Sequence, residues 1–180
     1  QEYKYQNLPI VAIDRVMNED IPVVESDNYN GGKLATKLLI AQGAKNIIHT
    51  NGPIDLQTPA NRRRLAYEDT MKAYQLIPRT VTLDFNISYV KKKQIFFQMF
   101  EDYPKIDGIF ASNDIDAALI LQVAKEKGLN VPADLLVVGY DGTLMTRSIL
   151  PDLTTVIQPI NDIADTAVAI LMKRINKEET

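Results

Sequence analysis

The sequence has no cysteine and a single histidine among its 180 residues. The absence of cysteine excludes disulfides, thiolate nucleophiles and zinc ribbons. The one histidine, His49, leaves no set of histidines to hold a metal ion. It stands inside an apolar segment, and no nucleophile–base pattern surrounds it. We therefore expect no metal and no cofactor, and we interpret His49 as a core or strand-end histidine.

Long apolar runs and a strong excess of one charge are also missing. No stretch of about 18 apolar residues occurs, so the sequence predicts no membrane span. The opening QEYKYQNLP lacks the apolar segment of a secretory signal. The formal net charge is −3, which does not favour nucleic acid as a partner of this segment. With 46% hydrophobic residues, the chain predicts a folded domain with a large core.

Short apolar runs alternate with longer amphipathic stretches along the chain. The predicted strands are 10–13, 21–26, 46–50, 80–85, 106–111 and 135–140, and the predicted helices are 31–42, 62–75, 88–103, 115–127 and 161–175. This alternation indicates an α/β fold with a doubly wound parallel sheet and helices on both faces. In the last helix, the spacing predicts a buried side formed by Ala164, Ala167, Val168, Leu171 and Ile175.

Both ends of the sequence suggest a piece of a longer chain. The first predicted strand begins almost at once, and the last helix ends where an α/β chain normally continues. We expect further sequence on one or both sides.

Polar side chains follow nearly every predicted strand. They are Asp14 and Arg15, then Asp27, Asn28 and Asn30, then Asn51 with the later run Arg62–Arg64, then Asp84 with Phe85, then Asn113 with Asp114, then Asp141, and finally Gln158. Asp and Asn are common in loops because they cap helices and form turns, so no single one is informative. In an open parallel sheet, however, ligands bind beyond the carboxyl ends of the strands. Their recurrence there predicts a binding site.

The chemistry of this set suits a small polyol. It offers carboxylate acceptors, amides that both donate and accept, fork-shaped arginine donors and one aromatic plane, Phe85. Each sugar hydroxyl donates one hydrogen bond and accepts others, and the C–H face of a sugar ring can pack on an aromatic ring. A buried hydroxyl without a partner costs about 1–3 kcal/mol, so such a site discriminates between sugars.

Other interpretations of these residues are weaker. Asp114 and Asp116 could be a catalytic pair, but their place at a helix start favours capping. Gly31-Gly32-Lys33 lacks the spacing of a phosphate-binding loop. In Arg62–Arg64 we expect one side chain to face the cleft and two to be solvated, although a phosphate or nucleic-acid patch stays open. We expect Lys91–Lys93 to be an exposed helix start.

Several segments together carry a family resemblance. They are VAIDR (11–15), SDNYNGGKLATKLLIAQG (26–43), NGP (51–53), R-x-x-x-Y (63–67), ASNDIDAAL (111–119), GLNVPADLLVVGYDG (128–142) and LPDLTTVIQP (150–159). In order and spacing they resemble the effector-binding core of LacI-type transcriptional repressors, which shares its fold with periplasmic sugar-binding proteins. TPANRRRLAYEDTM (58–71) and the Asp14-Arg15 pair further resemble the ribose operon repressors.

The resemblance implies roles for individual residues. Arg63 matches the ligand-clamping arginine, with Arg62 or Arg64 as substitutes if the loop is shifted. The other ligand positions implied are Asp14, Arg15, Asn30, Phe85, Asn113, Asp141 and Gln158. Asp114 is expected to be a structural cap. Ala66 and Ala44 stand where the family usually has Gly and His, and neither departure concerns the cleft chemistry.

The resemblance also implies a two-lobe fold with most of the first lobe missing. Residues 1–27 and 158–180 would be remnants of the N-terminal lobe, and 28–157 the C-terminal lobe. The implied function is sugar sensing between the lobes of a cytoplasmic homodimer, with no enzyme activity and no membrane association. A helix-turn-helix absent from this chain would bind operator DNA. The alternatives are a periplasmic sugar-binding protein and, since fold does not imply function, an enzyme on the same fold.

Overall fold

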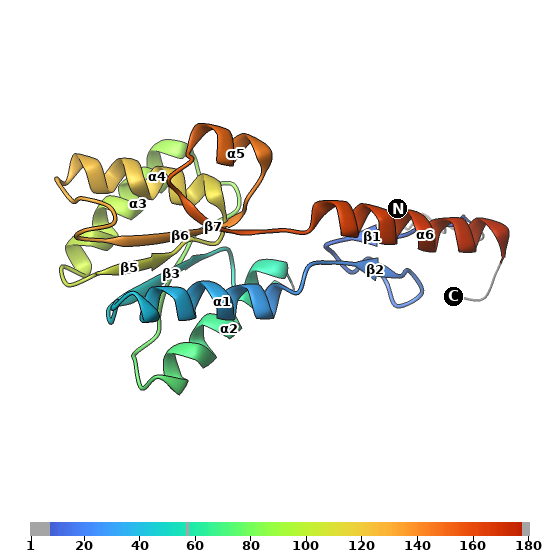
Figure 1. The fold of residues 1–180 in the computed structure, drawn as a ribbon, viewed down its shortest axis with the longest axis horizontal. Coiled ribbons are helices and arrows are strands. Elements are labelled where there is room, and N and C mark those ends of the chain that lie inside the picture. The colour runs from blue at the N-terminus through green and yellow to red at the C-terminus, as the bar shows by residue number, and fades with distance from the viewer. Residues whose placement is uncertain (1–7, 57, 178–180) are drawn as a thin grey trace. The chain divides into compact units, whose positions relative to one another are not determined.

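A computed structural model of the chain describes residues 8–56 and 58–177. The described residues divide into two compact units (Figure 1). Unit 1 comprises the residues up to Ser26 together with those from Pro159 onward, and unit 2 runs from Asp27 to Gln158. The opening segment QEYKYQN lies outside the described residues.

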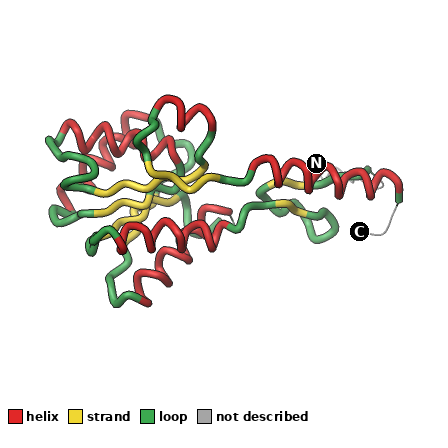
Figure 2. Tube along the Cα trace, viewed as in Figure 1, coloured by secondary structure: helices red, strands yellow, loops and turns green. Residues whose placement is uncertain are grey.

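Unit 2 is built on a five-stranded sheet in the order β4-β3-β5-β6-β7, in which every neighbouring pair is parallel. Its elements in chain order are α1 (Asn28–Ala41), β3 (Ile47–Asn51), α2 (Pro59–Ala73), β4 (Arg79–Thr82), α3 (Tyr89–Asp102), β5 (Gly108–Phe110), α4 (Asp114–Glu126), β6 (Leu136–Asp141), α5 (Leu144–Ile149) and β7 (Thr154–Ile157). Figures 1 and 2 show α1 and α2 on one face of the sheet, and α3 and α4 on the other. The predicted doubly wound parallel sheet is confirmed.

Two apolar cores lie against the two faces of this sheet. Leu39, Tyr67 and Met71 from α1 and α2 pack on one face. On the other face, α3 and α4 contribute a larger cluster, which includes Phe96 and Ile120. All five residues of β3 are buried, as expected for a strand covered on both sides.

Polar side chains begin the helices of unit 2. Asp27, Thr58, Ser88, Asn113 and Thr143 each accept a hydrogen bond from the backbone of the first turn of their helix. At the other end, Gly43 and Gly128 follow α1 and α4 with φ of 100° and 76°, a region where glycine pays no Cβ penalty. These signals are local, which is why the helix positions could be predicted.

Two glycines that the sequence analysis compared with a phosphate loop lie inside α1. Gly32 marks the crossing of α1 and α2, because a Cβ at this position would come within 2.6 Å of the backbone oxygen of Arg63. The glycine therefore serves close helix packing.

Unit 1 contains two short parallel strands, β1 (Ala12–Ile13) and β2 (Val23–Val24), with helix α6 (Ile160–Asn176). The predicted buried side of α6 is largely wrong. Ala167 is buried, but Ala164, Val168 and Ile175 are exposed. The two short strands give this helix little surface to cover it.

Two further elements were not predicted: the short helix α5 and the edge strand β7. Among the described residues, no helix is both long and apolar enough to cross a bilayer.

Candidate functional site

The carboxyl ends of the five strands of unit 2 meet at one edge of the sheet, because all five are parallel. The chain order reverses between β3 and β5, which are neighbours in the sheet. A crevice forms at such a switch point, and ligands of open α/β sheets bind there. The polar residues that follow the strands are therefore considered together.

Arg63, near the start of α2, is anchored at this edge. Its Nε donates to Oδ1 of Asn28 at 2.9 Å, and its Nη1 donates to the backbone oxygen of Ser112, just after β5, at 2.7 Å. The guanidinium carbon lies 3.6 Å from the ring centre of Tyr140 in β6. Arg63 is only 7% exposed, so these contacts fix the guanidinium in a desolvated setting where its interactions are strong.

Tyr140 lies buried under this guanidinium. Burial raises the pKa of its phenol, and the positive charge of Arg63 opposes that shift. The phenol is therefore neutral near pH 7 and forms a flat surface for the arginine.

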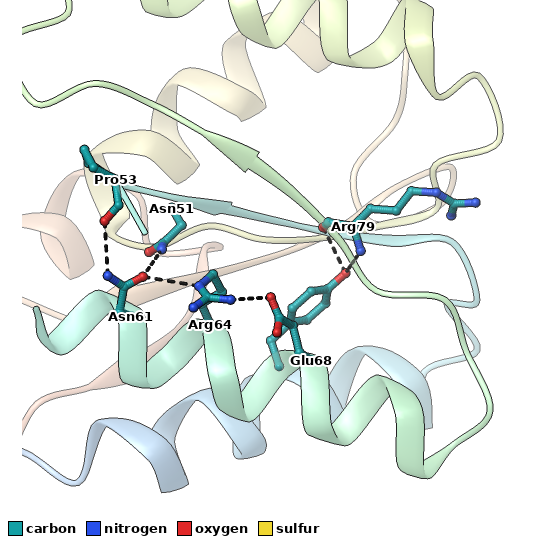
Figure 3. Close-up of polar contacts among 7 residues, drawn as sticks. Asn51, Pro53, Asn61, Arg64, Glu68 and Arg79 are labelled. Carbon is teal, nitrogen blue, oxygen red and sulfur yellow. Dashed lines mark hydrogen bonds and ion pairs between the residues drawn. The ribbon is translucent and has the colours of Figure 1, made fainter. Parts of the chain in front are cut away.

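Of the two arginines beside Arg63, only one is solvated, whereas the sequence analysis expected both to be. Arg62 is exposed. Arg64, however, is partly buried: its Nη1 pairs with Oε1 of Glu68 at 2.5 Å, and its Nε donates to Oδ1 of Asn61 at 3.2 Å (Figure 3). The expectation is wrong for Arg64, because an i,i+4 carboxylate on the same helix holds its charge.

Asn61 fastens the loop after β3 to the start of α2. Its Nδ2 donates to the backbone oxygen of Pro53 at 3.1 Å, and its Oδ1 accepts from Nδ2 of Asn51 at 2.7 Å (Figure 3). The same Nδ2 also donates to the backbone oxygen of Leu56. Asn51 ends β3 and is buried, and its Oδ1 has no hydrogen-bond partner among the described residues. The sequence analysis missed Asn61, although its place three residues after the Thr58 cap was a usable signal.

Asn113 is the N-cap of α4. Its Oδ1 accepts from the backbone N–H of Asp116 at 2.8 Å, and its Nδ2 donates to Oγ of Ser112 and Oδ2 of Asp116, both at 3.2 Å. Asp116 is also paired with Lys92 of α3 at 2.6 Å. The amide is thus held in one orientation at the carboxyl edge, and one lone pair of its oxygen is left for a further donor.

The lysines at the start of α3 correct another expectation. Lys91 is exposed, but Lys92 and Lys93 are partly buried and reach α4, where they pair with Asp116 and Glu126. They join two helices rather than forming only a solvated surface.

Asp141 ends β6 beside Gln158, which follows β7. The Nε2 of Gln158 donates to Oδ1 of Asp141 at 2.8 Å, and its backbone N–H donates to the backbone oxygen of Asp141 at 3.1 Å. Asp141 has φ of 121°, a strained value for a residue with a side chain. These two predicted ligand residues are therefore in direct contact.

Asp114 was expected to be a structural cap. The cap of α4 is Asn113, and the carboxylate of Asp114 instead accepts from Oγ1 of Thr155 at 2.5 Å and from the backbone N–H of Gly142 at 2.8 Å. The interpretation of Asp114 and Asp116 as caps is wrong, because both carboxylates are buried and take partners from other elements or from the Asn113 side chain.

Phe85 and Asn30 are surface residues of unit 2. Phe85 follows β4, is 57% exposed, and lies beside Gly52, where an added Cβ would come within 3.4 Å of the ring. Its ring is thus available at the carboxyl edge. Asn30 is exposed in the first turn of α1, and its backbone N–H donates to Oδ1 of Asp27.

Asp14 and Arg15 belong to unit 1, directly after β1. Asp14 has φ of 65°, and its Oδ1 is buried without a hydrogen-bond partner among the described residues. Arg15 is exposed, and its backbone N–H donates to the backbone oxygen of Ile13. A strained backbone with an unpaired carboxylate oxygen is typical of a residue selected for a site rather than for stability.

His49 is a core residue, as expected, and its two ring nitrogens have different surroundings. Nδ1 lies 2.8 Å from the backbone oxygen of Phe110, and Nε2 is buried without a partner among the described residues. Burial lowers the pKa of the imidazole to about 3, and the Phe110 carbonyl opposes this shift. Among residues 8–56 and 58–177, no group of three or more His, Asp or Glu could hold a metal ion.

Comparison with known proteins identifies the family. The model of the periplasmic-binding-protein-like domain matches residues 36–180. The chain is 39% identical to the ribose operon repressor of Halalkalibacterium halodurans over 178 residues, which are 99% of this chain and 53% of that protein. It is 41% identical to the sucrose operon repressor of Pediococcus pentosaceus over 175 residues, which are 97% of this chain and 53% of that protein. It thus spans about half the length of these curated relatives.

A solved structure agrees with these relatives. A periplasmic binding protein/LacI transcriptional regulator from Alkaliphilus metalliredigens QYMF, complexed with D-xylulofuranose, has a TM-score of 0.87 and 30% sequence identity. The similarity covers 99% of this chain and 66% of that chain. The chain belongs to the periplasmic-binding-protein-like family, in the form found in LacI-type transcriptional regulators.

Proposed function

We propose that this chain is the effector-binding core of a sugar-responsive transcriptional regulator. The sugar binds at the carboxyl edge of unit 2, where Arg63, Phe85, Asn113, Asp141 and Gln158 contact it. The other proposed ligand residues are Asp14, Arg15 and Asn30. Residues 1–27 and 158–180 are part of the N-terminal lobe, and 28–157 form the C-terminal lobe.

The observation that carries this proposal is the contact between Asp141 and Gln158 at the edge where Arg63 is anchored. A carboxylate can accept from two neighbouring hydroxyls, and an amide beside it can donate and accept. The exposed ring of Phe85 supplies a surface for the C–H face of a sugar. The relatives are named as repressors, so the comparisons do not favour the alternative of a transport protein.

A free monosaccharide is the ligand that we propose, with ribose as the first candidate. The relatives named for ribose and for sucrose have nearly equal identity to this chain, so their names alone do not choose between the two sugars. The related structure that holds D-xylulofuranose supports a single five-membered ring. Arg64 is paired with Glu68, so the arginine run offers less positive charge to a phosphate than the sequence suggested.

The mechanism is a shift between two arrangements of the lobes. A ligand favours one arrangement only by the difference in its affinity for the two. In a homodimer, that shift changes the spacing of two helix-turn-helix heads, which must match the half-sites of the operator. Leu144, Met145 and Ile149 on α5 are exposed and apolar, and we propose that a second copy of the chain covers them.

Calorimetric titration and thermal unfolding of the full-length protein test the sugar site. We expect ribose to bind, and at about 100 times its dissociation constant to add about 2.7 kcal/mol of stability. Asp141→Asn and Arg63→Ala should weaken ribose binding and give a much smaller response at the same ribose concentration. Asp152→Asn, which removes an exposed carboxylate just before β7, should retain the full response.

Other outcomes would change the proposal in defined ways. Binding of sucrose alone would replace the monosaccharide with a disaccharide. A response only to ribose 5-phosphate would place a phosphate at the arginine run. If Asp141→Asn responds like Asp152→Asn, the ligand does not use the carboxyl end of β6, and the proposed site is wrong.

A further inference from the structure

We propose that Asp114 is a positioning residue that holds Asp141 in the conformation in which its carboxylate meets the ligand. The inference rests on the proposed sugar binding at Asp141. In this role Asp114, at the start of α4, acts on the residues at the end of β6.

The carboxylate of Asp114 connects the end of β6 to β7. Its Oδ2 accepts from the backbone N–H of Gly142, the residue after Asp141, at 2.8 Å. Its Oδ1 accepts from the hydroxyl of Thr155 in β7 at 2.5 Å. Asp114 is 3% exposed, so both bonds lie out of water, where a charged acceptor makes them strong.

The backbone around Asp141 needs such an anchor. Asp141 and Gly142 follow each other with φ of 121° and 59°. A residue with a Cβ at positive φ is strained, and it stays there only when the surroundings over-determine its conformation. The Gly142 bond to Asp114 fixes the residue on one side of Asp141, and the Gln158 backbone bond fixes Asp141 itself.

Neighbouring positions leave room for this arrangement only because they are glycines. A Cβ at Gly139, in β6, would overlap Oδ1 of Asp114. A Cβ at Gly142 would come within 2.6 Å of the Ile157 side chain in β7. Gly139 therefore lets the carboxylate of Asp114 approach β6 closely, and Gly142 lets the Asp141–Gly142 turn pack against β7.

Helix capping alone does not explain Asp114. Asn113 already caps α4, and both oxygens of Asp114 take donors from outside that helix. The place of Asp114 in the first turn of α4 lets the helix N-terminus stabilise its negative charge, while its two oxygens accept from Gly142 and Thr155. The role of the residue is therefore directed at the Asp141–Gly142 turn.

A double-mutant cycle on the full-length protein tests this role through ribose affinity. The variants are Asp114→Ala, Asp141→Asn and the two combined, with Ala124→Gly as the control that loosens the far end of the same helix. We expect Asp114→Ala to weaken binding by about tenfold or more, Ala124→Gly to leave it within about twofold, and the combined variant to bind no worse than Asp141→Asn alone. A purely structural role would give losses that multiply.

Conservative variants separate geometry from charge and guard against misfolding. Asp114→Asn keeps an acceptor for the Gly142 N–H and should recover much of the affinity lost in Asp114→Ala, although its charge is gone. Thr155→Val removes only one of the two bonds and should give a smaller loss, which Thr155→Ser restores. If Asp114→Asn and Asp114→Ala are equally impaired, charge rather than positioning is the cause.

A measurement without ligand keeps the two proposals distinguishable. Amide hydrogen exchange at Gly142 should be faster in Asp114→Ala than in wild type and unchanged in Ala124→Gly. If the wild-type protein binds no sugar but Gly142 exchanges faster in Asp114→Ala, the sugar proposal fails, and the anchoring of Gly142 by Asp114 stands. If Gly142 exchanges at the wild-type rate in Asp114→Ala, the anchor does not exist and the inference is overturned.

Discussion

At the residue scale, His49 makes a clear case for pH-dependent stability. The Phe110 carbonyl can only accept, so Nδ1 carries the proton of the neutral ring, and Nε2 is buried with no hydrogen-bond partner in the part of the chain that the structure describes. The folded-state pKa of about 3 lies below the unfolded value of about 6.5, so the unfolded chain binds the additional proton as pH falls. The stabilising contribution is complete above pH 6.5 and is lost progressively between pH 6.5 and 3.

We predict that this one group costs about 2 kcal/mol of unfolding free energy at pH 5 and about 4 kcal/mol at pH 3, relative to pH 8. Urea unfolding at these pH values measures it. Because His49 is the only histidine, His49→Asn, which can still donate to Phe110, should flatten the profile between pH 8 and 5. Equal pH dependence in wild type and variant would show that the imidazole is protonated in the folded state.

Residue types were predicted more successfully than their partners. The recurrence of polar residues after strands located the carboxyl edge, because parallel strands bring their ends together wherever they are in sequence. The partners of Arg64, Asp114 and Lys92 come from tertiary contacts or from the choice between equivalent rotamers on a helix face. No local pattern encodes those choices, and the glycines at 139 and 142 only become informative once β6 and α4 are in contact.

At the scale of elements, the crossing of α1 and α2 yields a second prediction. Gly32→Ala places a methyl group against the backbone of Arg63, and a backbone cannot move aside as a side chain does. We expect a net loss of about 2 kcal/mol, since overpacking outweighs the roughly 1 kcal/mol that alanine gains in a helix. Chemical denaturation of Gly32→Ala, with the exposed neighbour Lys33→Ala as control, measures it. A Gly32→Ala variant as stable as the control would mean that α1 and α2 move apart to accommodate the methyl group without a measurable loss of stability.

The elements that the sequence analysis missed are those with weak periodicity. Strand β7 is an edge strand of four residues with both ends exposed, and α5 has six residues and none buried, so neither shows an apolar stripe. The failure on α6 has a different cause. Its apolar residues do repeat at helical spacing, but periodicity states which side can be buried and not what covers it.

At the scale of the whole molecule, the proposed dimer depends on α5. Replacing Met145, which is exposed and apolar, by glutamate should separate the full-length protein into monomers, because a buried charge without a partner strongly disfavours an interface. Sedimentation velocity distinguishes the two states. Lys37→Glu, an exposed change of charge on α1, is the control. A Met145→Glu variant that stays dimeric would place the interface elsewhere.

The two proposed binding events must also be coupled reciprocally. If ribose lowers the affinity of the full-length protein for its operator by some factor, operator DNA must lower the affinity for ribose by the same factor, since both report one free energy. Couplings of this kind are commonly about 5–150-fold. Fluorescence anisotropy with a labelled operator duplex, measured with and without saturating ribose, gives the first factor, and calorimetry with and without the duplex gives the second. An inducer and a corepressor differ only in which lobe arrangement they favour, so the sign of the measured change assigns ribose to one of these two roles. At a ribose concentration that just saturates the wild type, Asp141→Asn should bind the operator with nearly the affinity of the ligand-free protein. An operator affinity that ribose leaves unchanged in the wild type, despite measurable ribose binding, would show that the two lobe arrangements bind the sugar equally well, and the population-shift mechanism would then be wrong.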